Sequence, residues 1–278
     1  MIGTGDQAGK GDRGVKATMV SVAARPGRVN EDFTGATPTA AVVVDGAGIP
    51  GAESTCRHGV AWYAHTLGGS LLSLLSLAPG SSLPALLAEA ITQVTDVHRH
   101  TCDVTNPVSP SAAVAVLRVS GGDLDHLVLG DTIVALDRPA GPPIVTTDPR
   151  ELSVSRAYEP ELAATIPGSD EYNRVLAHLR ARRNRPGGFW VAKDDPRAAD
   201  EAVTGRRSVS ELSAAVLLSN GAGRIVDLFG LTGWPHALAV LASNGPAALV
   251  DQVRQAEAEH ATRPDDATIA YCTDLGGR

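Results

Sequence analysis

The sequence predicts an α+β fold, in which strands and helices form separate layers around one core. Short runs of β-branched and small apolar residues are bounded by Gly, Pro, Asn and Asp, which is the pattern of strands and turns. Longer segments with apolar residues at helical spacing lie between these runs and come in pairs. Runs of strands with paired helices favour antiparallel layers over an alternating βαβ arrangement.

A single domain is predicted over residues 17–278, preceded by a flexible tail over residues 1–16. The tail is rich in Gly, Asp and Lys and has no apolar segment. A chain of 278 residues is long enough to bury a core of its own. Its 43% hydrophobic and 20% charged residues are typical of a globular protein.

The first part of the domain combines two strands with two helices. Strands are predicted over 18–24 and 40–44, and the loop between them contains Gly, Pro, Asn and Asp. A helix follows over 53–77, where apolar residues recur at helical spacing. A second helix is predicted over 83–101, because Ser81, Ser82 and Pro84 occupy the positions of a cap and first turn.

The middle of the chain changes to an alternating pattern. Strands over 112–119, 124–129 and 133–137, separated by glycine-containing turns, predict an antiparallel meander. Residues 138–170 are rich in proline and polar residues and predict a long surface excursion. The remaining predicted elements are helices over 171–183, 225–229, 236–242 and 246–260 and strands over 188–192, 209–218 and 267–272.

Composition argues against two classes of partner. A formal net charge of -7 and a pI near 5.6 provide no basic face, so no nucleic-acid partner is predicted. No stretch approaches the ~20 apolar residues of a membrane span, so no membrane partner is predicted either. Three widely spaced cysteines favour a reducing cytoplasm over a disulfide framework. High usage of Ala, Gly, Pro and Arg with few Lys indicates a high-GC bacterial source.

Acidic residues fall at the ends of predicted strands at four separate points of the sequence. These points are Asn30-Glu31-Asp32, Asp45-Gly46, Gly130-Asp131 and Asp265-Asp266. An Asp-Gly pair alone is first of all a turn signal. Carboxylates at strand ends are also the ligands that a hard divalent ion such as magnesium or manganese requires. A shared metal site is one economical explanation of the whole set.

The order of these elements resembles that of the type-2C serine/threonine phosphatases, a family of metal-dependent protein phosphatases. The resemblance extends from about Met19 to Cys272. Its elements are Arg25 to Asp32, Val42 to Gly46, Ser109 to Ala112 followed by Leu129 to Thr132, Leu217 to Gly221, and Pro264 to Thr268. Five elements in the right order are a more specific signal than one motif.

The resemblance implies a sandwich of two antiparallel β-sheets flanked by helical layers, with two manganese or magnesium ions at one end. It implies that Asp45 bridges both ions and that Glu31 and the Gly46 carbonyl hold one of them. Asp265 and Asn220 would hold the other ion. These residues would then support hydrolysis of a phosphomonoester by metal-activated water, with no protein nucleophile.

The resemblance also assigns residues around the ions. Asp32 would orient metal-bound water, and an arginine near the opening motif would bind the substrate phosphate. At the position where the family spacing puts that arginine, this sequence has a glycine. Arg25 and Arg28 are therefore the candidates, and Arg28 is the choice. Asp131 occupies the position associated with a third ion.

Three positions depart from the family pattern. Asn220 replaces a metal-binding aspartate, and an amide oxygen supplies no negative charge, so metal affinity and activity are expected to fall. Arg224 stands where many active relatives have an acidic residue, so a third ion beside Asp131 is not expected. Ala47 replaces a histidine that acts as general acid in eukaryotic relatives and is often missing from bacterial ones.

Three functions follow from this pattern. The first is an active phosphatase for phosphorylated serine or threonine in proteins of a bacterial regulatory pathway. The second is a pseudophosphatase that acts as a binding or regulatory protein, as suggested by Asn220 and Arg224. The third is a phosphatase-fold enzyme for a small phosphomonoester.

Other polar groups have an ordinary interpretation and a functional alternative. The arginine run at 180–185 is typical of a solvated helix end, and a dock for a phosphorylated partner is the alternative. For His98, His100 and Cys102, polar residues at a helix end are favoured over a zinc cluster. His58 and His65 share a helix face, and with Cys56 nearby a metal or substrate role is the alternative to packing or solvation.

Overall fold

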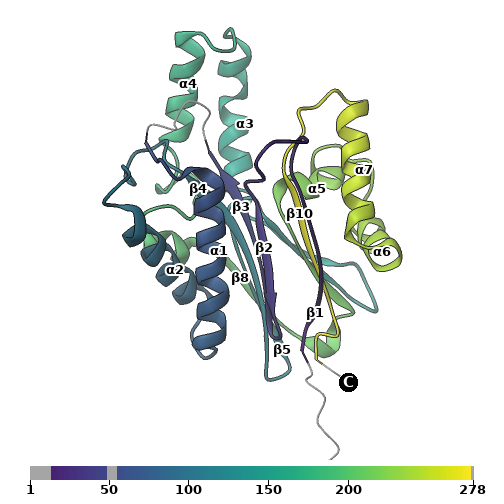
Figure 1. Ribbon diagram of the computed structural model, residues 1–278. Coiled ribbons are helices and arrows are strands. Elements are labelled where there is room, and N and C mark those ends of the chain that lie inside the picture. The colour runs from purple at the N-terminus through teal and green to yellow at the C-terminus, as the bar shows by residue number, and fades with distance from the viewer. Residues whose placement is uncertain (1–13, 49–54, 277–278) are drawn as a thin grey trace, which may run out of the picture.

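Two five-stranded antiparallel sheets pack face to face, with helices on both outer sides (Figure 1). The computed structural model describes residues 14–48 and 55–276. The first sheet has the order β1 (Lys16–Val22), β10 (Ala267–Thr273), β9 (Ala214–Leu218), β6 (Ile133–Asp137) and β7 (Ile144–Thr146). The second has the order β2 (Phe33–Thr37), β3 (Ala40–Ala47), β4 (Ser111–Ser120), β5 (Asp123–Leu129) and β8 (Val203–Ser208). The predicted α+β sandwich is confirmed.

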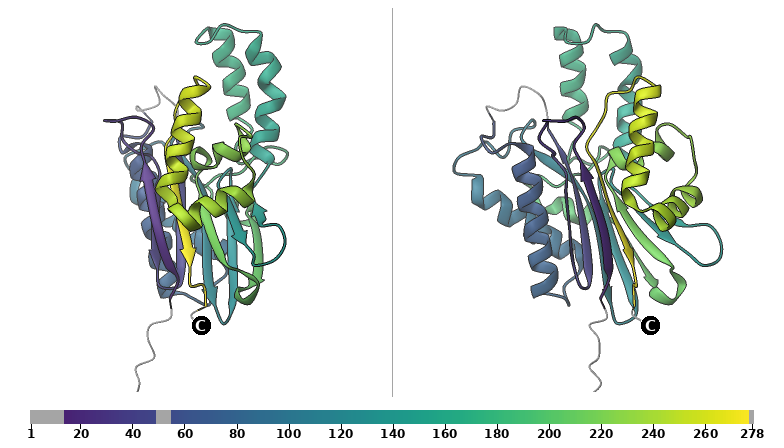
Figure 2. Two further views of the ribbon diagram at one scale, coloured as in Figure 1. Left: turned by 90° about the vertical axis from the view of Figure 1, so that its right-hand side faces the viewer. Right: turned by 45° about the vertical axis from the view of Figure 1, so that its right-hand side comes forward.

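Helices cover the outer face of each sheet. The second sheet is covered by α1 (Gly59–Leu77) and α2 (Leu83–His98), and the first by α5 (Asn220–Asp227), α6 (Trp234–Asn244) and α7 (Pro246–Glu259). Two further helices, α3 (Arg150–Ala163) and α4 (Asp170–Arg180), form a pair that extends beyond one end of the sheets (Figure 2). None of the described helices is long and apolar enough to cross a membrane.

Three apolar layers hold the sandwich together. In β3, Val42 and Val44 belong to the layer under α1 and α2, whereas Ala41 and Val43 belong to the layer between the sheets. The third layer lies between the first sheet and helices α5 to α7. Because both faces of a central strand are covered, its sequence is apolar at nearly every position and does not alternate.

The predicted meander is wrong at its last strand. Strands β4 and β5 pair as expected, but β6 pairs with β9 and β7 in the opposite sheet. Gly130 lies at the crossing with a φ of 77°, and a side chain there would collide with Ala113. The glycine therefore allows the chain to change sheets at this point, and Asp131 follows it at the end of the sandwich.

Several other predicted boundaries are corrected by the structure. The loop after β1 contains β2, the proline-rich excursion contains β7 and α3, and β8 precedes the strand predicted over 209–218. Residues 188–192 form no strand and contribute only isolated bridges. The helix α3 has no buried residue, which explains why apolar periodicity did not indicate it.

The ends of the early elements also differ. Residues 1–13 of the predicted tail lie outside the described residues, and Lys16 already belongs to β1. The first helix begins at Gly59 rather than at residue 53. Residues 53–54 of the predicted helix lie outside the described part of the chain. The second helix ends at His98 rather than residue 101, and Ser82 caps its start as predicted by accepting a hydrogen bond from the Ala85 amide.

Candidate active site

A cavity of about 490 Å³ lies at one end of the sandwich, where the acidic motifs meet. Its lining includes every predicted site residue except Asp32, namely Arg28, Glu31, Asp45, Gly46, Asp131, Asn220 and Asp265. These residues come from the end of β3, the loop before β2, the crossing before β6, the start of α5 and the turn before β10. Segments far apart in the sequence therefore supply one wall of carboxylates.

Glycines allow these motifs to approach one another. A side chain at Gly46 would collide with the carbonyl oxygen of Glu31, and one at Gly221 would collide with the carbonyl oxygen of Asp266. Asp45 and Gly46 both lie within β3, so the Asp-Gly pair is not a turn here. Its glycine is required for close packing of backbone against backbone.

The loop that carries Glu31 is held by a neighbouring carboxylate. Asp266 is buried and accepts hydrogen bonds of 2.7 Å from the amides of both Ala24 and Glu31. Glu31 itself is partly buried at the cavity. Asp266, in the turn before β10, thus holds the loop that carries Glu31. The sequence did not assign this role to Asp266.

Asp32 lies beneath the cavity wall rather than in it. Its side chain is 3% exposed, and its Oδ2 atom has no hydrogen-bond partner. Burial raises the pKa of Asp32 to about 7, while hydrogen bonds from Thr268 and Ser219 act in the opposite direction. An unpartnered buried carboxylate oxygen is the kind of group that ordered water or a nearby cation satisfies.

Asp45 and Asp131 crowd the floor of the cavity. Asp45 Oδ2 accepts a 2.8 Å hydrogen bond from the backbone N–H of Asn220, at the start of α5. Burial, with the negative charges of Asp32, Asp131 and Asp265, raises the pKa of Asp45 well above its usual range. Burial also raises the pKa of Asp131. This part of the cavity therefore holds more negative charge than its protein partners neutralise.

The opposite side of the cavity contains its own cation. Arg224 Nη2 lies 2.6 Å from Asp265 Oδ2, and Arg224 Nη1 lies 2.9 Å from Glu257 Oε1. Glu257 is buried, pairs also with Arg254 at 2.7 Å, and accepts a hydrogen bond from the Asp265 amide. Asp265 is thus engaged by an arginine that is itself anchored in a network.

The side chain of Asn220 also has a hydrogen-bond partner in the protein. Its side-chain Nδ2 donates a 2.9 Å hydrogen bond to Asp131 Oδ2. An aspartate in this place would put a third carboxylate beside Asp45 and Asp131, whereas the amide supplies a donor. Asn220 and Arg224 together reduce the negative charge of this side of the cavity without an ion.

Two cavity residues, Glu151 in α3 and Arg183 just after α4, were not predicted as site residues. The Nε and Nη1 atoms of Arg183 are buried without a hydrogen-bond partner, and its guanidinium lies 5.9 Å from the Phe189 ring centroid. Partial burial raises the pKa of Glu151, in the first turn of α3, to about 8; the charge of Asp131 adds to this effect and that of Arg183 opposes it. The signal for Arg183 was the arginine run at 180–185, whose interpretation as a solvated helix end is wrong for this residue.

Comparisons with known proteins identify the fold. No family model matches the sequence, and no curated protein matches it. Among solved structures, the catalytic domain of the serine/threonine protein phosphatase PstP in complex with two manganese ions superposes with a TM-score of 0.59 at 15% identity, covering 94% of this chain and 98% of that one. This is the fold of bacterial serine/threonine phosphatases.

Two further phosphatase-fold structures agree with this assignment. Stp1 from Staphylococcus aureus matches with a TM-score of 0.58 at 14% identity, covering 93% of this chain and 94% of that one. PppA, a regulatory component of the type VI secretion system in Pseudomonas aeruginosa, matches with a TM-score of 0.54 at 18% identity, covering 93% and 97%. The type-2C resemblance predicted from the motifs is confirmed as a resemblance of fold.

The two halves of the phosphatase-fold cavity fit a divalent ion differently. Glu31, Asp45 and the Gly46 carbonyl are oxygen donors, burial raises the pKa of both carboxyl groups, and the cation beside Glu31, Arg28, is exposed, so this half fits an ion. Asp265 and Asn220 are engaged by Arg224 and Asp131, so this half does not fit a second ion without rearrangement. No three acidic side chains in the described part of the chain bring ligand oxygens within 4.8 Å of one another. Water would therefore complete the coordination.

Proposed function

We propose that the chain is a metal-dependent phosphomonoester hydrolase that acts on phosphorylated serine or threonine in proteins of a bacterial regulatory pathway. The single observation that carries the proposal is the cluster of Glu31, Asp45 and Asp131 at the end of the sandwich, where burial raises the pKa of each carboxyl group and the cation beside Glu31, Arg28 at 3.6 Å, is exposed. The two manganese ions of the PstP domain, which has the same fold, support a divalent ion as cofactor.

In this proposal one ion is held by Glu31, Asp45 and the Gly46 carbonyl. A manganese or magnesium ion bound there would supply Lewis-acid activation of water and of the phosphoryl group. Asp32 lies behind this position, with one carboxylate oxygen free to accept a hydrogen bond from water. Asp266 keeps Glu31 in place through the backbone of the opening loop. The second ion implied by the sequence resemblance would first have to displace Arg224 from Asp265.

Arg183 is our proposed phosphate-binding residue. It lines the same cavity as the carboxylates, and two of its guanidinium nitrogens are buried without partners. A guanidinium presents paired donors that match a phosphate, and leaving them unsatisfied is unfavourable. Arg28, chosen from the sequence, is 42% exposed and lies 3.6 Å from Glu31, so it is placed at the cavity rim and partly engaged.

A second candidate function rests on Arg224. If this arginine and Asn220 replace an ion that turnover needs, the chain is a pseudophosphatase that binds phosphorylated partners through Arg183 and releases no phosphate. The same cavity serves both functions, and only turnover separates them. The proposed location for either function is the cytoplasm, which agrees with the three free cysteines.

Hydrolysis assays separate the two candidates. Purified protein is assayed with para-nitrophenyl phosphate and with a phosphothreonine peptide, in the presence of manganese, magnesium or a chelator, with Asp45→Ala as the control. Metal-dependent turnover that is lost in the variant supports the hydrolase, and a preference for the peptide supports a protein substrate. Absence of turnover at saturating manganese, with phosphopeptide binding retained, would establish the pseudophosphatase instead.

A further inference from the structure

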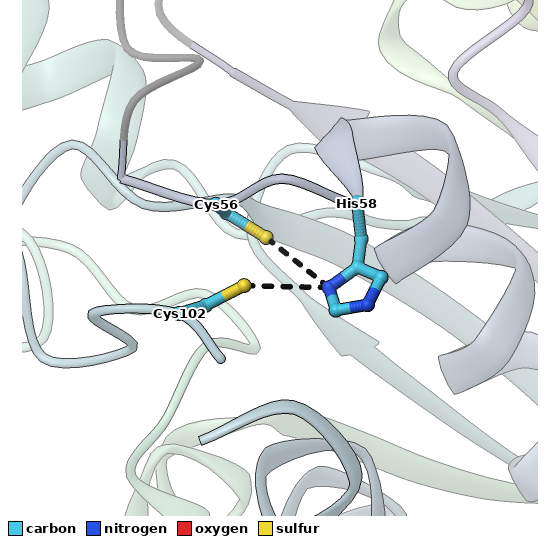
Figure 3. A group of neighbouring side chains, drawn as sticks. All are labelled: Cys56, His58 and Cys102. Atoms are coloured by element: carbon cyan, nitrogen blue, oxygen red, sulfur yellow. Dashed lines mark hydrogen bonds between the residues drawn. The ribbon is translucent and has the colours of Figure 1, made fainter. Parts of the chain in front are cut away.

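A cluster of soft ligand atoms lies outside the acidic cavity. Cys56 and His58 precede α1, and Cys102 follows α2. Figure 3 shows that both thiols point toward the His58 ring. The Sγ atom of Cys102 lies 3.3 Å from His58 Nδ1 and that of Cys56 lies 3.9 Å from the same nitrogen, and all three ligand atoms lie within 4.8 Å of one another. It is the only such group of His, Cys, Asp or Glu side chains in the described part of the chain.

The surrounding structure holds these three side chains in place. The Asp103 amide donates a 3.0 Å hydrogen bond to the Thr55 carbonyl, which joins the two segments next to the cysteines. The Cys102 amide donates to the His98 carbonyl at the end of α2. The His58 ring stacks on Trp62 with a centroid distance of 4.3 Å. The cluster is therefore fixed by helix ends and ring packing, as a preorganised metal site requires.

The separations match those of a tetrahedral zinc site. With Zn–S of about 2.3 Å and Zn–N of about 2.0 to 2.1 Å, tetrahedral angles place a sulfur and a nitrogen about 3.6 Å apart and two sulfurs about 3.8 Å apart. The observed sulfur-to-nitrogen distances of 3.3 and 3.9 Å lie on either side of the first value. All three ligand atoms lie within 4.8 Å of one another, which is close enough for one ion to contact all of them.

We propose that Cys56, His58 and Cys102 form a binding site for one zinc ion, with the fourth position taken by solvent. Two thiolates and an imidazole are soft and borderline ligands, which select zinc over manganese or magnesium. The acidic cavity has the opposite preference, because its donors are oxygens. Cys56 is buried while Cys102 and His58 are partly exposed, which leaves an approach for the ion.

The zinc site has a structural consequence for the acidic cavity. Val60, two residues after His58, packs so closely on β3 that a side chain at Gly46 or Gly48 would collide with it. The first turn of α1 therefore packs directly against the proposed ligand Gly46. A zinc ion would tie this turn to the end of α2, and we expect it to raise the melting temperature whether or not the cavity turns over phosphate.

Cobalt substitution tests the site directly. The full chain is purified with reduced thiols under anaerobic conditions, stripped of metal, and titrated with Co²⁺ in the presence of excess Mn²⁺. One equivalent of cobalt should produce thiolate-to-cobalt charge-transfer absorption together with the intense d–d bands of a tetrahedral site. The same signal should appear in Asp45→Ala, which separates this site from the acidic cavity and from the proposed hydrolase activity.

Matched cysteine variants provide the control. Cys102→Ser and His58→Ala should each weaken cobalt binding at least about ten-fold, equivalent to ~1.4 kcal/mol. Cys272→Ala, which removes the buried cysteine of β10 outside the cluster, should leave the signal intact. Circular dichroism checks that each variant is folded, and Cys102→Ser replaces a partly exposed side chain.

Three results would overturn the proposal. The first is a folded wild-type protein that gives no thiolate-to-cobalt absorption. The second is a signal of unchanged strength in Cys102→Ser. The third is freshly isolated protein in which Cys56 and Cys102 are joined in a disulfide and no zinc is bound, since the pair would then be a redox device and not a metal site.

Discussion

The two halves of the acidic cavity differ in how the protein treats negative charge. In the half formed by Glu31, Asp45 and the Gly46 carbonyl, burial and neighbouring carboxylates raise the pKa values of Glu31 and Asp45, and the exposed Arg28 offsets part of this shift at Glu31. In the other half, Arg224 engages Asp265 at 2.6 Å and is anchored by a buried glutamate. The first half is suited to bind a metal ion, whereas in the second half the cation is a side chain of the protein, Arg224.

This difference shows that Asn220 and Arg224 act together. Asn220 removes one negative charge and donates a hydrogen bond to Asp131, and Arg224 neutralises Asp265. A chain that had only lost an aspartate would leave Asp265 as a free ligand. Here Asp265 and Asn220, the two proposed ligands of one ion, each have a protein partner, so this half needs no metal to neutralise Asp265.

The largest effect is expected for Asp45→Ala, which removes the central ligand of the ion-binding half. Loss of several kcal/mol of metal-assisted stabilisation lowers turnover of a phosphomonoester by about a thousand-fold or more. Thermal unfolding in chelator should show no loss of stability, because burial and the neighbouring carboxylates raise the pKa of Asp45, so its charged form is disfavoured in the folded protein. Turnover retained in this variant would show that the ion lies elsewhere.

Arg183→Ala is expected to have the next largest effect. Losing a charged hydrogen-bond donor to phosphate corresponds to about 1.5 to 3 kcal/mol, so KM for a phosphopeptide should rise roughly ten- to a hundred-fold. Manganese affinity, measured by calorimetry, should change little. Arg28→Ala is the matched control and should alter KM only a few-fold, since Arg28 is exposed. Equal effects of the two variants would contradict the assignment.

Asn220→Asp should sharpen the contrast between apo and metal-bound protein. In chelator the new carboxylate faces Asp45 and Asp131 and removes the amide hydrogen bond, so the melting temperature should fall. With manganese the same carboxylate becomes a ligand, and affinity should rise by about ten-fold, or ~1.4 kcal/mol. Asn220→Ala, which adds no charge, should fall in stability without a gain in metal affinity. A flat response of Asn220→Asp in both conditions would show that this position faces no ion.

The smallest metal effect is expected for Arg224→Gln, which frees Asp265 but leaves Asn220 in place. Metal affinity should rise a few-fold, and the free energy of unfolding should fall by about 1 to 3 kcal/mol because Glu257 loses one of its two arginine partners. Arg224→Lys keeps a positive charge and should show a weaker metal effect. Denaturant unfolding and calorimetry measure the two quantities. Metal affinity below that of the wild type would mean that Arg224 helps rather than replaces the ion.

Much of the fold could be predicted from the sequence because most core strands are apolar runs with clear turn residues. The same analysis failed where the signal was tertiary. The exposed helix α3 has no apolar face, and whether β6 pairs with β5 or crosses to the other sheet depends on contacts distant in sequence. Local pattern carries neither kind of information.

The acidic residues of the cavity could be predicted because their motifs follow one another in a recognisable order. Their partners could not, because Arg224 was identified as a departure but its contact with Asp265 depends on the packing of α5 against α7. Arg183 was assigned to a solvated helix end because nothing in its local sequence shows that the chain turns back into the cavity. The proximity of Cys102 to Cys56 and His58 likewise depends on tertiary structure, because the start of α1 and the end of α2 lie next to each other.

Calorimetric titration of the metal-free wild-type protein with Mn²⁺ tests the difference between the two halves most directly. We expect one manganese ion per chain to bind tightly, no such binding in Asp45→Ala, and a second ion of comparable affinity only in a variant that combines Asn220→Asp with Arg224→Gln. Two ions of similar affinity in the wild-type protein would contradict the account, as would one ion that survives the loss of Asp45.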